Sequence, residues 1–241
     1  MTKPRVHYIS IKGTPDVYDR AKYADVEDGP DDRAWVARRL DEQGLADAVD
    51  YDGTVDTDGE SLPAPEAVDA VMLGGSFHSI NEGRPWQRST MAWLERYRRL
   101  DRPLLGLCGG HQMMAVMAGM TVEPRPNGPK PGSFEIELTE TGRAHYLFDG
   151  FADRPAFHFG NSDQVTDVPA GATLLSYGDD SPAEGLDYGG NWIGVQFHPE
   201  MRHDFLVRYW RDSRPEHMAN YRALPDAPKL LVNFLRGSGI I

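Results

Sequence analysis

The sequence predicts an α/β protein with a doubly wound, mostly parallel sheet flanked by helices. Short apolar segments of strand length alternate with segments of helical spacing, which is the pattern of βαβ units. The clearest unit is residues 103–119, where an apolar run meets a glycine-containing turn and then a second apolar run. At 241 residues the chain is long for one domain, but α/β folds of this size commonly have one core. We therefore expect a single domain over residues 1–241.

The first third of the chain predicts two strands and a helix. Residues 6–11 are rich in β-branched and aromatic side chains, as in a strand, and residues 33–44 have helical spacing. Between them, residues 12–32 are polar and aperiodic, which predicts a long loop. Such loops are often lids or binding elements, although a plain solvated insertion is the commoner outcome. The acidic segment 50–66 leads to an apolar strand at residues 68–73.

The remaining elements complete a mixed sheet. Pro85 opens a helix whose apolar residues keep a core-facing spacing as far as Leu100. A buried strand at 103–107 and a helix at 110–119 follow. Beyond residue 130 the pattern changes to short strand-like pieces, which we expect to be edge and return strands, and the last forty residues look helical. These pieces are residues 134–138, 156–160, 172–177 and 192–197.

Composition excludes several classes of protein. With 40% hydrophobic and 26% charged residues, the chain has the composition of a folded globular protein. No apolar run approaches the roughly 18 residues of a membrane span. The formal charge of −12 disfavours nucleic acid as a ligand. The single cysteine cannot form an internal disulfide, and the N-terminal residues lack a secretory pattern, so we expect a cytoplasmic protein.

Cys108 is the first candidate catalytic residue. It lies between the strand and the helix of residues 103–119, with Gly106 and Gly110 two positions away on either side. Small residues at these positions leave room for a tight turn that exposes a nucleophile, as in a nucleophile elbow. The N-terminus of the following helix favours a thiolate, the reactive form of cysteine. The alternative is a buried structural cysteine, which the two glycines make less favourable.

His198 and Glu200 are candidates for the base and its partner. They end the apolar run of residues 192–197 and flank Pro199, which favours an extended backbone. In an extended chain residues i and i+2 face the same side, so Glu200 can orient the imidazole. A base held by a carboxylate is what a cysteine nucleophile needs. Taken alone, the same three residues could be a polar turn that closes a strand.

Three motifs resemble the class I (triad-type) glutamine amidotransferases. They are GLCGGHQ at 106–112, GVQFHPE at 194–200 and VMLGGS at 71–76, and their order and spacing are also similar. The segments at 137–151 and 168–176 resemble connecting segments of stand-alone members of that family. The resemblance covers most of the chain. It implies a flavodoxin-like sheet and a Cys-His-Glu triad of Cys108, His198 and Glu200.

The resemblance also implies further site residues. The loop after residue 73 supplies the oxyanion hole in that family, so the N–H groups of Gly75 and Gly109 would form it. Gln112 would contact the bound glutamyl group. Asn161, Ser162 and Asp163 lie where the family often has His-x-Asp before the last strand, and these positions line the pocket for the amino-acid end of the substrate. Because asparagine replaces histidine here, the identity of the substrate is open. The replacement bears less on the catalytic reaction.

Other residues that attract attention have ordinary explanations. Ser76 stands where many members of the family carry proline, which indicates an adapted pocket. His111, His158 and His203 are isolated histidines, and each fits packing or surface placement better than catalysis. No cluster of ligands has the spacing of a zinc site. We therefore expect no metal and no cofactor.

The reaction expected from the resemblance is hydrolysis of a γ-glutamyl amide through a γ-glutamyl thioester. In the leading interpretation the substrate is glutamine, and ammonia passes to a separate synthase, because the sequence contains no synthetase segment. In the second, the protein is a stand-alone γ-glutamyl hydrolase or peptidase that releases a larger amine; Asn161, Ser76 and the loop at 12–32 favour it slightly. A non-catalytic binding relative is the third, and the intact Cys, His and Glu argue against it.

Overall fold

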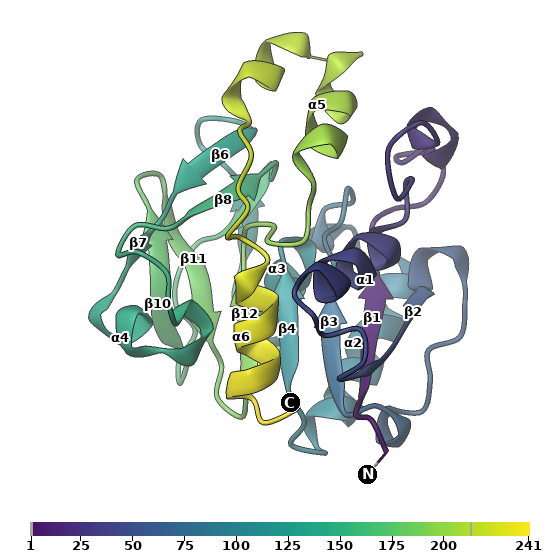
Figure 1. Ribbon diagram of the computed structural model, residues 1–241. Coiled ribbons are helices and arrows are strands. Elements are labelled where there is room, and N and C mark those ends of the chain that lie inside the picture. The colour runs from purple at the N-terminus through teal and green to yellow at the C-terminus, as the bar shows by residue number, and fades with distance from the viewer. Residues whose placement is uncertain (1, 213) are drawn as a thin grey trace.

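An eight-stranded mixed sheet forms the centre of the computed structural model, which describes residues 2–212 and 214–241 (Figure 1). Five neighbouring strands are parallel, and the last three are antiparallel to their neighbours. In spatial order the strands are β2 (Asp50–Val55), β1 (Arg5–Ser10), β3 (Ala70–Leu73), β4 (Leu104–Leu107), β12 (Trp192–Val195), β11 (Ser181–Asp187), β10 (Thr173–Gly178) and β7 (Glu137–Leu138). The predicted mostly parallel sheet is confirmed.

Helices cover both faces of this sheet, so it is doubly wound as predicted. On one face Val36 of α1 and Leu230 of α6 share a buried apolar cluster with Tyr8 of β1, and on the other Leu94 of α2 packs with Val71 of β3. The helices are α1 (Asp32–Glu42), α2 (Pro85–Arg98), α3 (Gly109–Met117), α4 (Glu140–Ala144), α5 (His203–Arg211) and α6 (Lys229–Gly237). Within the described ranges, no helix is both long enough and apolar enough to cross a membrane.

Two strands of the central sheet are missing from the sequence prediction. β2 lies inside the acidic segment 50–66, and it pairs with β1 at the sheet edge, where polar side chains remain partly exposed. β11 contains proline, glycine and glutamate, which are depleted in strands, yet it pairs with both β10 and β12. In both cases pairing with a neighbouring strand overrides the weak local preference.

The prediction that residues 134–138 and 156–160 both join the mixed sheet is wrong in part. Only β7 joins it, while β6 (Gly132–Glu135) pairs with β8 (Ala156–Phe159) in a separate two-stranded sheet. Stacking of Phe157 on Phe197, with ring centroids 4.0 Å apart, attaches β8 to the end of the central core. A second small sheet pairs β5 (Val122–Pro124) with β9 (Asp163–Val165).

The predicted loop at residues 12–32 is folded against α5 and is not a solvated insertion. It contains the short 3-10 helix η1 (Arg20–Tyr23), and its Tyr18 is only 2% exposed. Tyr18 and Tyr23 share an apolar cluster with Phe205 of α5 and Trp35 of α1. In Figure 1, α5 and the following chain project beyond the sheet. Because β4 ends beside this region at Cys108, the cluster adjoins the predicted nucleophile.

Candidate active site

Cys108 occupies a strained turn between β4 and α3. Its φ of 49° and ψ of −100° are unusual for a residue other than glycine, as at a nucleophile elbow. A Cβ atom at Gly106 would lie 2.5 Å from the sulfur of Met114, and one at Gly110 would lie 2.4 Å from the carbonyl oxygen of Leu73. Both glycines are therefore required by the packing, as predicted from their spacing.

The thiol of Cys108 points into the pocket and has two polar neighbours. It is 6% exposed, and it shares one side of the pocket with His198, because a Cβ atom at Gly75 would lie 3.6 Å from Cβ of Cys108 and 2.8 Å from Cε1 of His198. The side-chain amide of Gln196 donates a hydrogen bond to its sulfur, with Nε2 and Sγ 3.5 Å apart. The sequence analysis did not select Gln196. Its position two residues before His198 in an extended chain, hence on the same side, is the signal that could have identified it.

His198 and Glu200 have the relationship predicted from their spacing. Nδ1 of His198 lies 2.7 Å from Oε1 of Glu200, and both side chains are buried. The backbone on either side is held in place: the N–H of His198 donates to the carbonyl of His158, and the guanidinium of Arg39 donates to the carbonyls of Glu200 and Met201. Glu200 therefore fixes the orientation of an imidazole whose backbone is already anchored.

The electrostatics of this site favour a protonated imidazole. Burial by itself would lower the pKa of His198, but the charges of Glu200 and Cys108, together with hydrogen bonds to both, raise it to about 10. The negative charge of the Glu200 carboxylate, 2.7 Å from Nδ1, explains this direction. The arrangement at neutral pH is thus an imidazolium next to a sulfur nucleophile.

Gly75 and Gly109 lie next to each other beside Cys108. A Cβ atom at Gly75 would be 2.8 Å from Cε1 of His198 and 3.6 Å from Cβ of Cys108, while one at Gly109 would be 2.6 Å from the backbone nitrogen of Ser76. The N–H of Gly109 opens helix α3, and the first N–H groups of a helix have no acceptor within it. Backbone N–H groups with this placement suit an oxyanion.

The predicted substrate-binding residues also line this pocket. Gln112 donates through Nε2 to the carbonyl of Asp163 and to Oε1 of Gln196, at 2.9 and 3.2 Å. Asn161 donates to the same carbonyl at 2.9 Å, and its buried Oδ1 has no hydrogen-bond partner in the described structure. Ser162 is exposed at the rim. Together these groups form a polar end of the pocket suited to an amino acid.

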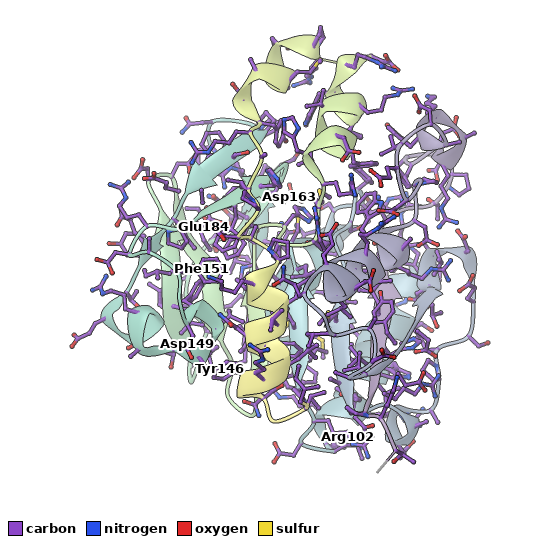
Figure 2. The ribbon with its side chains drawn as sticks, in the orientation of Figure 1. Arg102, Tyr146, Asp149, Phe151, Asp163 and Glu184 are labelled. Atoms are coloured by element: carbon purple, nitrogen blue, oxygen red, sulfur yellow. The ribbon has the colours of Figure 1, made fainter. Side chains whose placement is uncertain are left out.

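Ser76 and Asp163 complete the polar end. The hydroxyl of Ser76 accepts a hydrogen bond from the N–H of His78 at 3.1 Å, which closes the turn after Gly75. Asp163, labelled in Figure 2, accepts a hydrogen bond of 2.5 Å from the hydroxyl of Ser79 and lies below α5. Its carboxylate lines the pocket, where it suits the ammonium group of an amino acid.

The same pocket also has an aromatic lining, which the sequence analysis did not predict. The cavity has a volume of about 350 Å³, within the range of about 300–1,000 Å³ that is usual for small-molecule sites. Its rings come from segments that are far apart in the chain, so no local motif reveals them. We call this set the aromatic wall: Trp35, Phe77, Phe205, Tyr209, Trp210 and Tyr221.

Lys12 and Asp32 lie on the same side of the pocket as the aromatic wall. The ammonium of Lys12 is 3.5 Å from the ring centroid of Trp35 and 4.4 Å from that of Phe205. Burial lowers its pKa to about 7, although Asp32 and Glu200 act in the opposite direction. Asp32 accepts hydrogen bonds from the hydroxyls of Tyr8 and Ser10.

Two of the three isolated histidines have the packing roles expected of them, and His203 is exposed at the start of α5. His111 lies 3.2 Å from the carbonyl of Ala183, and burial lowers its pKa to about 4. His158 contacts the hydroxyl of Ser133, and burial together with the charge of His198 lowers its pKa to about 3. Across residues 2–212 and 214–241, no group of three His, Cys, Asp or Glu side chains is arranged to hold a metal ion.

Comparison with known proteins agrees with this geometry. The family model named glutamine amidotransferase class-I matches residues 34–205. A crystal structure of a glutamine amidotransferase from Thermotoga maritima superposes with a TM-score of 0.76 over 99% of both chains, at 21% identity. This likeness shows that the fold is shared.

Two of the matched relatives have different names. A glutamine-hydrolysing GMP synthase from Aeropyrum pernix is 30% identical over 194 residues, which are 80% of this chain but only 34% of that protein. The chain thus spans about a third of that relative. Gamma-glutamyl peptidase 5 of Arabidopsis thaliana is 25% identical over 150 residues, which are 57% of this chain and 56% of the relative. On the extent of the family match, the chain belongs to the class I glutamine amidotransferases.

Proposed function

We propose that this protein hydrolyses γ-glutamyl amides through a γ-glutamyl thioester on Cys108. The thiolate attacks the amide carbon, and the resulting oxyanion accepts hydrogen bonds from the N–H groups of Gly75 and Gly109. When the tetrahedral intermediate collapses, the C–N bond breaks and the imidazolium of His198 transfers its proton to the departing amine. Glu200 keeps the ring aligned throughout.

The second half of the reaction uses the same groups. A water molecule attacks the thioester carbon and gives a proton to the now neutral His198. Collapse of this second intermediate breaks the C–S bond, releases glutamate and restores the thiolate–imidazolium pair. The net reaction consumes one water and one amide and yields one glutamate and one amine, so no oxidant, metal or cofactor is needed.

One observation carries this proposal: a buried imidazole paired with a carboxylate lies beside a buried sulfur, two glycine backbones and a polar pocket. Glutamine is the first candidate substrate, because relatives include proteins named glutamine-hydrolysing GMP synthase. In this version the ammonia passes to a synthase on another polypeptide, and turnover increases when that partner binds.

A stand-alone γ-glutamyl hydrolase is the second candidate. The specific observation in its favour is the aromatic wall, which extends the pocket beyond the polar end where a glutamyl group fits. A relative named gamma-glutamyl peptidase agrees with it. Both candidates share the thioester and differ only in the amine that leaves.

Trapping the thioester tests the shared chemistry. The protein is mixed with glutamine and with γ-glutamyl methylamide, quenched in acid, and weighed intact by mass spectrometry. We expect a γ-glutamyl adduct on Cys108 that hydroxylamine removes. If neither amide gives an adduct, and the Cys108→Ala variant releases glutamate as fast as the unsubstituted protein, the proposal is wrong.

A further inference from the structure

The aromatic wall lies on the side of the site where the amine departs. His198 must approach the leaving nitrogen to protonate it, so the leaving group lies on the imidazole side of Cys108. From His198 the chain continues through Glu200 and Met201 directly into α5, which carries Phe205, Tyr209 and Trp210. The polar groups of Gln112, Asn161 and Asp163 line the same cavity, so it offers both polar and aromatic surface to one substrate.

One ring of the wall, Phe77, lies in a stack of near-parallel rings. Phe77 stacks on Tyr209 with centroids 5.2 Å apart and planes inclined by 23°, and on Tyr18 with centroids 5.1 Å apart and planes inclined by 20°. Phe77 is two residues after Gly75, so one short segment serves both the predicted oxyanion hole and the wall. Because Phe77 already has two stacked partners, a flat ring that enters beside the stack meets ring edges, and it gains edge-to-face contacts that a non-aromatic group of equal size does not.

A buried cation already occupies part of this wall. The ammonium of Lys12 lies 3.5 Å from the ring centroid of Trp35 and 4.4 Å from that of Phe205. Lys12 is only 4% exposed, so water screens it poorly. A second cation at the wall would meet repulsion from Lys12 when Lys12 is protonated, and an uncharged aromatic group would not.

We infer that the leaving group of the natural substrate is an aromatic amine, so that the substrate class is γ-glutamyl arylalkylamides and arylamides. This inference rests on the second candidate for the proposed function and names its substrate class. The glutamyl end binds among Gln112, Asn161 and Asp163, while the ring of the amine lies against Phe77 and Tyr209. The products are glutamate and the free aromatic amine.

A matched series of amides tests the inference in the unmodified protein. The value of kcat/KM is measured for the γ-glutamyl amides of methylamine, cyclohexylmethylamine and benzylamine, and for glutamine. The cyclohexylmethyl and benzyl amides have similar size and the same methylene spacer, so their comparison isolates the aromatic ring. We expect benzylamide to exceed cyclohexylmethylamide about 3- to 10-fold and to exceed methylamide about 10- to 100-fold.

Variants locate the preference on the wall. Phe77→Leu and Tyr209→Leu keep apolar bulk but remove a ring, and each is expected to reduce the ratio of benzylamide to cyclohexylmethylamide at least about 3-fold. Tyr177→Leu is the matched control, because Tyr177 is 41% exposed and lies outside the pocket lining. If one wall variant does not fold, as judged by circular dichroism, the other supplies the test.

Two results would overturn the inference. One is equal kcat/KM for the benzyl and cyclohexylmethyl amides, with glutamine preferred over both. The other is a benzyl preference that both wall variants retain in full. In either case the adduct with glutamine or the methylamide still forms if the proposed function holds. Loss of every γ-glutamyl adduct would refute the proposed function instead, so the two failures are distinguishable.

Discussion

Glu200 and His198 form a buried pair in which Oε1 of the carboxylate lies 2.7 Å from Nδ1 of the imidazole. Burial opposes the charged ring, but the charges of Glu200 and Cys108 raise the pKa of His198 to about 10. The ring acts as the proton donor to the leaving amine in the proposed reaction. Activity is therefore expected to fall as the pH rises through this pKa.

Replacement of Glu200 tests this dependence. In Glu200→Gln the negative charge is lost, so the pKa of His198 falls and the alkaline limb of the pH–kcat/KM profile moves to lower pH. The rate at neutral pH is expected to fall about 10²- to 10⁴-fold, because an amide does not orient an imidazolium as a carboxylate does. Glu216→Gln, at an exposed position, is the control. An alkaline limb that stays in place would contradict the role of Glu200.

Removal of the sulfur nucleophile separates chemistry from folding. Cys108→Ala is expected to reduce glutamate release at least about 10⁴-fold, since the other groups cannot form a thioester. The free energy of unfolding in urea is expected to change much less, because the substitution removes one atom at the edge of a pocket. If the variant lost activity only because it was unfolded, its urea titration would show no cooperative unfolding transition.

The close packing of Gly110, in the turn that carries Cys108, leads to a prediction about stability. A Cβ atom at Gly110 would lie 2.4 Å from the carbonyl oxygen of Leu73, so Gly110→Ala forces α3 away from β3. We expect a loss of about 1–3 kcal/mol in the free energy of unfolding. Gly160→Ala is the matched control, because its Cβ would meet only the hydroxyl of Tyr221, at 3.8 Å. Equal urea midpoints for the two variants would refute the steric argument.

Gln196 is expected to support the nucleophile through its hydrogen bond to the sulfur of Cys108. Gln196→Met keeps a similar shape but removes the donor, and hydrogen bonds to charged groups contribute enough to predict a drop of about 10- to 100-fold in kcat/KM. The rate of alkylation of Cys108 by iodoacetamide, measured against pH, reports the thiolate directly. Gln164→Met is the control outside the pocket lining. An unchanged alkylation profile would exclude this contribution.

Local chemistry was enough to predict the centre of the site. The glycines around Cys108 and the alternate positions of His198 and Glu200 impose steric and geometric conditions that operate over a few residues. The structure accordingly brings these three side chains together. The catalytic roles themselves remain predictions until the variants above are measured.

Other parts depended on contacts that a single sequence does not reveal. β2 and β11 have polar or weakly strand-forming residues and become strands because their neighbours pair with them. Similarly, Phe77 and Tyr209 are separated by more than half of the chain and stack only after α5 folds over the end of the sheet. The loop at residues 12–32 looked like surface chain because its aromatic residues are sparse and lack periodicity.

The short segment from Gly75 to Phe77 connects the predicted oxyanion hole to the aromatic wall. The N–H of Phe77 donates to the carbonyl of Lys12 at 2.8 Å, which ties the segment to the chain just beyond β1. Only Ser76 separates Phe77 from Gly75, so an occupant that displaces Phe77 against this anchor is expected to move the peptide at Gly75 as well. The identity of the amine is consequently expected to change kcat as well as KM. An amide whose amine fits poorly would be turned over slowly even when it saturates the site.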